Sequence, residues 1–240
     1  MGILPGDIQQ GQLGDCYLQC ALSAMAEWPE RIQKLFTTEK ANSEGVYGIW
    51  VVWDGVLKEV IVDDYLWYNN KNRDLVSMRA QGKELWPQLL EKTWAKLNGD
   101  YCSIDGGFAR DPLHHFTGAP VIHFRIKEQR LWNEWKEVLW TQCLKGEGEH
   151  FIMTAGTYAE DPSGQQLGDT YERDGIFYCH AYTLLGAYLV TLKTGQQVKL
   201  LRFRNPHGQG EWKGKYSDND NQSWSQVPQS EKDRIQFNLF

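Results

Sequence analysis

The chain has 240 residues, which suits one large domain or two small ones, and its 41% hydrophobic and 23% charged content is that of a globular protein. The formal net charge is -6 without a basic stripe, so the electrostatic footprint of a nucleic-acid-binding protein is absent. There is no apolar run of about 18 residues and no signal-peptide pattern, which predicts no transmembrane segment. The five cysteines have no framework spacing and no clustering with histidine, which predicts reduced thiols in the cytoplasm and no zinc site.

The first predicted helix follows a polar, glycine-rich loop at residues 7–14. Asp15 is a suitable N-cap, and apolar residues then recur at helical spacing until Pro29 interrupts the pattern. Cys16 is therefore expected in the first turn of a helix.

Later segments alternate between the two kinds of element. The Asp54-Gly55 dipeptide separates two apolar stretches and is a strong signal for a β-hairpin. Residues 102–113 have the composition of a loop and are the best candidate for a domain boundary. The other predicted elements are strands at 47–53 and 56–62, helices at 84–97 and 131–144, and strands at 150–155, 176–192, 197–204 and 235–240. Helices dominate the first half and strands the second, which predicts an α+β fold.

Cys16 is the candidate nucleophile of a thiol protease. A thiol must ionise before it attacks a carbonyl, and the dipole at a helix start together with a nearby imidazolium favours the thiolate. Cys20 lies one turn further on in an apolar stretch and is expected to be inert. The competing interpretation of Cys16 is a buried structural cysteine.

His180 is the candidate base and Asn205 the residue that orients it. If Thr194-Gly195 are the two turn residues of a hairpin, Asn205 faces Leu184, and the even spacing to His180 puts both side chains on one face of the sheet. A regular ladder leaves them about 13 Å apart, so a bulge or bend has to close the gap. The competing interpretations are a core histidine and an ordinary turn asparagine.

Gln10 is the candidate oxyanion donor. Its side-chain amide lies six residues before Cys16 in the loop that leads to the helix, and the backbone N–H of Cys16 is the second expected donor. The chain order of cysteine, histidine and asparagine matches the papain-type arrangement, although the local papain signature around the cysteine is absent.

At this point the sequence resembles the calpain protease core over nearly its whole length. The resemblance rests on three motifs in the family's order and on two further matches between them. The segments are residues 10–18 (QGQLGDCYL), His180-Ala181-Tyr182 with Gly186-Ala187, residues 204–208 (RNPHG) with Glu211-Trp212 and residues 216–218, then residues 85–92 and Gly106-Gly107.

The resemblance implies a papain-like cysteine protease fold with a cleft between a helical N-terminal subdomain and an antiparallel, β-rich C-terminal one. Residues 1–108 would carry the nucleophile and the oxyanion glutamine, and residues 109–240 the histidine and asparagine. It implies limited proteolysis of protein substrates, with Gly106, Gly107 and Cys179 at the substrate-binding surface. Regulatory domains or a regulatory subunit would be absent from this chain.

Two calcium sites within the core are also implied by the resemblance. Asp7 and Glu84 match acidic ligands of the first site, and Glu211 and Asp218 match ligands of the second. Calcium favours carboxylate and carbonyl oxygens. The competing interpretation of each is a solvated surface carboxylate.

This sequence departs from the family's pattern at several positions. Cys179 stands where the family has glycine and is expected to crowd the substrate backbone, and His207 stands where a tryptophan covers the histidine–asparagine pair. Tyr17 replaces another tryptophan. The chain is expected to be truncated at its C-terminus, which would leave the second calcium site incomplete.

These observations predict a calcium-dependent cysteine endopeptidase. The first alternative is a weakened or inactive calpain-like module that binds peptides or partners, which the changes at Cys179 and His207 motivate. The second is another acyl transfer at the same triad, such as transglutaminase-like or amidase chemistry.

Overall fold

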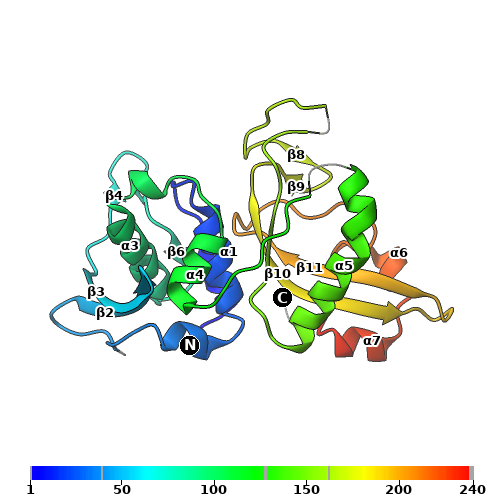
Figure 1. Ribbon diagram of the computed structural model, residues 1–240, viewed down its shortest axis with the longest axis horizontal. Coiled ribbons are helices and arrows are strands. Elements are labelled where there is room, and N and C mark those ends of the chain that lie inside the picture. The colour runs from blue at the N-terminus through cyan, green and yellow to red at the C-terminus, as the bar shows by residue number, and fades with distance from the viewer. Residues whose placement is uncertain (1, 39, 127–128, 162, 238–240) are drawn as a thin grey trace. The chain divides into compact units, whose positions relative to one another are not determined.

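A computed structural model describes residues 2–38, 40–126, 129–161 and 163–237 of the chain (Figure 1). Contacts between residues divide the chain into two units. Unit 1 comprises Met1–Arg125, Ala181–Thr183 and Arg204–Gly208, and unit 2 comprises Ile126–His180, Leu184–Phe203 and Gln209–Phe240. The mixture of helices and antiparallel strand pairs confirms the α+β class.

Unit 1 begins with short elements that lead into a buried helix. The single-turn helix η1 and the strand β1 come first, and β1 pairs antiparallel with β6. The elements are η1 (Pro5–Asp7), β1 (Ile8–Gln9), α1 (Cys16–Met25), α2 (Pro29–Gln33), β2 (Val46–Trp53), β3 (Val56–Asp63), β4 (Tyr68–Asn69), β5 (Asp74–Leu75), β6 (Arg79–Ala80), α3 (Trp86–Asn98), η2 (Cys102–Ile104) and α4 (Arg110–Thr117).

Helix α1 forms the centre of unit 1, since every residue after Cys16 in it is buried. Two hydrogen bonds from segments far away in the sequence hold it. Ser23 Oγ donates to Pro5 O over 2.8 Å, and Thr183 Oγ1 donates to Cys20 O over 2.9 Å. Helix α4 packs on α1 and β2, and α3 packs on β3 (Figure 1). A helix enclosed on all sides in this way presents only its N-terminal residue for chemistry.

Unit 2 contains a three-stranded sheet in the order β11-β10-β7. Helix α5 contacts β11 (both labelled in Figure 1) through Lys199. Its ammonium pairs with Glu137 at 2.6 Å and lies over the ring of Trp140. The elements are α5 (Gln129–Gly148), β7 (Thr154–Gly156), β8 (Glu172–Arg173), β9 (Ile176–Phe177), β10 (Ala181–Thr191), β11 (Gln197–Arg204), α6 (Asn221–Trp224) and α7 (Gln229–Arg234).

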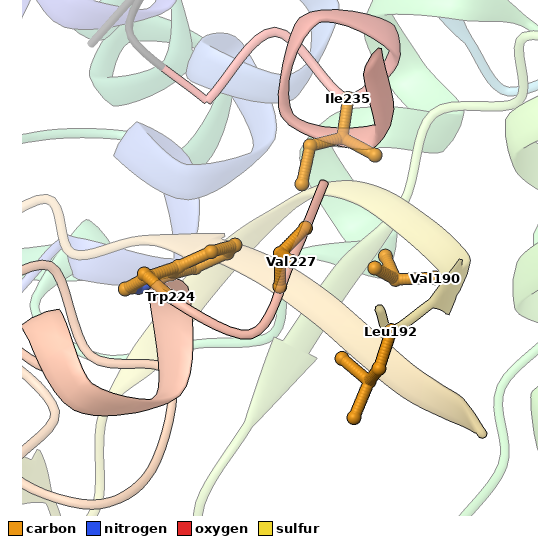
Figure 2. Packing of buried hydrophobic residues seen from close by; sticks show 5 residues of the cluster. All are labelled: Val190, Leu192, Trp224, Val227 and Ile235. Atoms are coloured by element: carbon orange, nitrogen blue, oxygen red, sulfur yellow. The ribbon is translucent and has the colours of Figure 1, made fainter. Parts of the chain in front are cut away.

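A small apolar core closes the far end of this sheet. Figure 2 shows five buried residues packed together, namely Val190 of β10, Leu192 just after it, Trp224 of α6, Val227 between α6 and α7, and Ile235 just after α7. Burial of apolar area at roughly 25 cal/mol per Å² makes such a cluster the main source of local stability. It anchors the hairpin at the end opposite to His180.

Most predicted elements are confirmed. Helix α1 begins at Cys16, the Asp54-Gly55 hairpin pairs residue by residue, and β11 has the predicted bounds. Helices α3 and α5 lie where two helices were predicted, and α3 ends at Asn98, followed by Gly99 as its C-cap with a φ of 112° that suits glycine.

Four predictions about secondary structure are wrong. Part of the predicted loop at 102–113 is helical, because Leu113 and Phe116 give α4 an apolar face and Gly118 ends it in the left-handed conformation. The strand predicted at 150–155 is β7, which begins only at Thr154. Residues 235–237 follow α7 without forming a strand, and the rest of that prediction lies outside the described residues.

The fourth concerns the strand predicted at 176–192, which is broken between Phe177 and Ala181. The turn that follows it also has three residues instead of two. Leu192 N donates to Gln196 O and Gly195 N donates to Leu192 O, with Gly195 at a φ of 84°. The register therefore shifts by one residue, and the parity argument for a shared sheet face of His180 and Asn205 is wrong.

Among the described residues, every helix is too short or too polar to cross a membrane.

Candidate active site

Cys16 is the first residue of α1 and is half-buried. Asp15 occupies the predicted N-cap position, but its side chain accepts no hydrogen bond from the first turn. Its Oδ1 instead accepts from Gln19 Nε2 over 2.6 Å inside the protein. The N-terminal N–H groups of the helix are therefore not neutralised by this carboxylate, which leaves their dipole acting on the Cys16 side chain.

A second buried carboxyl faces Asp15 from α3. Burial raises the pKa of Asp15 to about 6, and burial followed by the charge of Asp15 raises the pKa of Glu91 well above its usual value. Glu91 Oε1 accepts from Met78 N over 2.9 Å. Asp15 Oδ2 and Glu91 Oε2 are buried, and neither oxygen has a donor among the described residues. A proton shared between the two carboxyls satisfies both oxygens.

Cys20 provides an internal contrast to Cys16. It is fully buried, and its Sγ donates to Tyr17 O over 3.2 Å. Burial raises the pKa of the Cys20 thiol well above its usual value. Of these two cysteines in α1, only Cys16 has access to solvent and a helix terminus.

Gln10 lies in the loop before α1 and is half-buried. Its Nε2 donates one hydrogen bond to Leu13 O over 2.8 Å. A primary amide has two N–H groups, so one remains for an oxyanion.

Gly106 and Gly107 follow η2 in an exposed loop of the same unit. Gly106 N donates to Gly14 O over 2.9 Å, which joins this loop to the segment just before Cys16. The structure thus brings the two glycines of the predicted substrate-binding surface to the segment just before Cys16, the candidate nucleophile.

His180 lies in unit 2, directly before β10, and only 2% of it is exposed. Thr157 holds its main chain, because Thr157 N donates to His180 O over 2.9 Å and His180 N donates to Thr157 Oγ1 over 3.1 Å. The ring of Phe177 meets the imidazole edge-on at a centroid distance of 6.0 Å. A packed ring and a fixed main chain restrict the orientation of the imidazole.

Cys179 precedes His180, is exposed and has a φ of 48°. This left-handed conformation is uncommon for any residue other than glycine. The conformation breaks the strand between β9 and β10, which is why the strand prediction failed there. It also gives a backbone reason for a glycine at this position.

Asn205 follows the last residue of β11 and belongs to unit 1. Arg204 anchors it there, since its guanidinium donates to Ile8 O over 2.5 Å and the residue is half-buried. Asn205 Oδ1 accepts from His207 N over 3.0 Å in a local turn. The residue before Asn205 and the Asn205 side chain are thus each held by a hydrogen bond, and a bond from His180 to Asn205 stays a prediction.

The segments that carry Asp7 and Glu84 lie side by side. Gln81 N donates to Asp7 O over 2.9 Å next to the β1–β6 pair. Asp7 Oδ2 accepts from Leu4 N over 2.8 Å, and Glu84 Oε2 is buried with no hydrogen-bond partner. A buried carboxylate oxygen without a partner fits a cation ligand.

Glu211 and Asp218 belong to a loop of unit 2. Burial and the negative charge of Asp218 raise the pKa of Glu211. An open pocket of about 650 Å³ lies along this loop, lined by residues 211–215 with Ser217, Asn219 and Asp220. Over the part of the chain that the structure describes, no three His, Cys, Asp or Glu side chains gather closely enough to hold a metal ion.

Sequence reasoning missed three residues that support the site, namely Thr157, Arg204 and Asp105. Thr157 and Asp105 act through contacts with segments distant in sequence, so no local pattern could identify them. Arg204 lies in the 204–208 motif on which the resemblance was based, but its contact with Ile8 O could not be seen from the sequence.

The whole chain matches one protein family. The sequence pattern described as "Calpain family cysteine protease" covers residues 1–239. Calpain-9 of Mus musculus is 32% identical over 232 residues, which are 95% of this chain and 32% of that protein. Calpain-type cysteine protease DEK1 of Zea mays is 32% identical over 215 residues, 88% of this chain and 9% of that protein. The calpain-1 catalytic subunit of Rattus norvegicus is 31% identical over 242 residues, 97% of this chain and 31% of that protein.

The chain spans about a third or less of the length of these curated relatives. The match nevertheless runs from the first residues through the segment after Asn205, and it includes every motif on which the resemblance was based. The protein therefore belongs to the calpain family of cysteine proteases.

Proposed function

We propose that this protein is a calcium-dependent cysteine endopeptidase with a papain-like fold, in which Cys16, His180 and Asn205 form the triad. The observation that carries the proposal is the contrast between two cysteines of one helix. Cys16 is half-buried at the helix start, and Cys20 is sealed in the core. Residues 1–108 and 109–240 are the proposed subdomains, and proteins in the cytoplasm are the proposed substrates.

In the proposed reaction His180 takes the proton of Cys16, and the thiolate attacks the carbonyl carbon of the scissile peptide. The second N–H of Gln10 and the Cys16 N–H donate to the oxygen that becomes negative. His180 then protonates the leaving amine as the C–N bond breaks, which leaves a thioester. Water, deprotonated by His180, releases the acid and restores the thiol. Asn205 accepts from the imidazole and holds its tautomer.

Calcium is proposed to bind the carboxylates of Asp7 and Glu84, and at a second site those of Glu211 and Asp218. The buried, unpartnered oxygen of Glu84 supports the first site. Nearby negative charges at Glu211 and Asp218 support the second. When bound, the ion neutralises carboxylates that otherwise repel one another.

The test is casein cleavage with and without calcium. Cys16→Ala is expected to lower kcat by at least about 10³-fold, as loss of a nucleophile does in other proteases. Cys20→Ala, in the same helix, is the matched control and is expected to keep activity if the protein folds. Cleavage that persists in Cys16→Ala would show that Cys16 is not the nucleophile. Equal cleavage before and after chelation would show that the activity does not depend on calcium.

A second candidate is a calpain-like module that binds partners without cleaving them. The strained φ of Cys179 and the use of Asn205 Oδ1 by His207 N favour it. A folded protein that binds peptide but shows no turnover at any calcium concentration is the expected result in that case. The other acyl transfers are separated from proteolysis by an amine-incorporation assay.

A further inference from the structure

Asp105 makes a tether between two segments that lie 91 residues apart. Its Oδ1 accepts from Gly14 N over 2.8 Å, and one residue later Gly106 N donates to Gly14 O over 2.9 Å. The two bonds are reciprocal, so both the N–H and the C=O of Gly14 are held by the 105–106 segment. A Cβ at Gly14 would lie 2.6 Å from the same Asp105 oxygen, so the approach requires glycine.

Tyr17 makes a second tether from the first turn of α1. Its hydroxyl donates to Ile104 O over 3.2 Å and accepts from Trp94 Nε1 over 2.9 Å. The ring is buried, and a Cβ at Gly107 would lie 2.6 Å from its Cζ. The glycine loop therefore rests directly on a ring that two hydrogen bonds prevent from moving.

The first tether starts from Gly14, before Cys16, and the second from Tyr17, after it. Both end in the segment of residues 104–107, around Gly106. Residues 14 and 17 bracket the nucleophile, and they hold residues 105 and 104 together with Gly107. Gly106 has a φ of 85°, and the loop from residue 105 to residue 108 is exposed. An exposed main chain without side chains is a surface that an extended polypeptide can approach closely.

We propose that Asp105 and Tyr17 are positioning residues that hold the Gly106-Gly107 main chain at a fixed place beside Cys16, so that it binds the main chain of a polypeptide substrate. The proposal rests on the proposed protease function for its substrate class. It assigns the two residues to substrate alignment and not to activation of the thiol.

The experiment compares two reagents that alkylate Cys16, followed by mass spectrometry of the Cys16 peptide. Iodoacetamide reports the reactivity of the thiol alone, whereas a peptidyl chloromethyl ketone also needs the substrate main chain to be aligned. The measured quantity is the ratio of the second-order rate constant for the ketone to that for iodoacetamide. This ratio does not depend on turnover.

Asp105→Ala is expected to lower the ratio by about tenfold, the factor that corresponds to one hydrogen bond with a charged partner. Asp105→Asn keeps an acceptor oxygen and is expected to lower it by less than about threefold. Tyr17→Phe loses the bond to Ile104 O and is expected to fall between the two. Asp100→Ala is the matched control, because the hydrogen bonds that Asp100 accepts from Ser103 stay within the same segment, and it should leave the ratio unchanged.

The proposal is overturned by an unchanged ratio in Asp105→Ala, by equal losses in Asp105→Asn and Asp105→Ala, or by iodoacetamide and ketone rates that fall together. A parent protein that reacts no faster with the ketone than with iodoacetamide overturns it as well. Failure of the protease function is seen separately, as labelling by both reagents without cleavage of casein. A variant that does not fold is recognised by a faster reaction of the otherwise buried Cys20 with iodoacetamide. If Asp105→Ala does not fold, the ratio measured for Asp105→Asn tests the proposal in its place.

Discussion

The segment before Cys16 and the segment before His180 are built in opposite ways. Gly14 forms hydrogen bonds with Asp105 and Gly106, which follow it by 91 and 92 positions in the sequence. The next residue, Asp15, belongs to a buried carboxyl pair with Glu91. The main chain of His180 forms hydrogen bonds with Thr157, and its neighbour Cys179 has a left-handed backbone. Cys16, the proposed nucleophile, therefore has a rigid support, whereas His180, the proposed base, follows a strained residue, so we expect His180 to limit the efficiency of the proposed pair.

The largest expected effect concerns the carboxyl pair on the nucleophile side. The folded state raises the pKa of Glu91 and therefore binds more protons than the unfolded chain above the usual glutamate pKa. The parent protein loses stability as the pH rises through that window, and Glu91→Gln, which does not titrate, escapes the loss. The unfolding free energy of Glu91→Gln minus that of the parent should therefore increase by about 1.4 kcal/mol for each pH unit above about pH 5.

Urea unfolding between about pH 5 and about pH 8 measures this gap. Glu44→Gln is the matched control, because Glu44 is exposed in the same unit and should give a constant difference. A gap between the parent and Glu91→Gln that does not change with pH would show that the pair shares no proton.

The next effect concerns the support of the base. Thr157→Val keeps the shape of the side chain and removes the oxygen that accepts from His180 N and donates to Phe177 O over 2.7 Å. It is expected to lower the unfolding free energy by about 1–2 kcal/mol and kcat by more than it changes KM, because the imidazole loses its fixed position. A control, Thr141→Val on the exposed side of α5, removes a hydroxyl bond within one helix and should leave kcat unchanged. Equal kinetic constants in Thr157→Val and the parent would contradict the supporting role.

The smallest expected effect is a gain in stability, in contrast to the loss expected for Thr157→Val. Cys179→Gly relieves a left-handed backbone and should raise the unfolding free energy by about 1 kcal/mol. It also removes a side chain beside the proposed substrate path, so kcat/KM for casein should rise. Cys102→Gly, at an exposed cysteine in the short helix η2, should not stabilise the protein. A Cys179→Gly protein that is less stable than the parent would mean that the thiol makes a contact that outweighs the strain.

The parts of the fold that sequence reasoning predicted are those with a local signal. Asp54-Gly55 fixed the hairpin, and helical spacing after Asp15 fixed α1. The break at Cys179 was missed because nothing in the residue type announces a positive φ. The extra residue in the 193–195 turn was missed because one bulge changes the register without changing the composition.

In the candidate site too, some residues could be identified from the sequence and others depend on tertiary packing. Cys16 and Gln10 were identified from their position in the chain and the glycine pair from the family resemblance, and all of them lie in unit 1. The pairing of Asp15 with Glu91 depends on how α1 packs beside α3, which no pattern within either helix specifies. The meeting of Cys16 with His180 stays a prediction for the labelling and cleavage experiments to decide.

The hydrogen bonds from Thr183 to Cys20 and from Arg204 to Ile8 also set an order of events during synthesis. A ribosome releases the chain from its N-terminus, so the nucleophile helix emerges long before the two residues that complete its surroundings. Unit 1 cannot finish folding until residue 204 has left the exit tunnel, by which time the histidine has already been made. A nascent chain therefore carries an incomplete Cys16 site until residue 204 has emerged, which would restrain the proposed proteolysis at the ribosome.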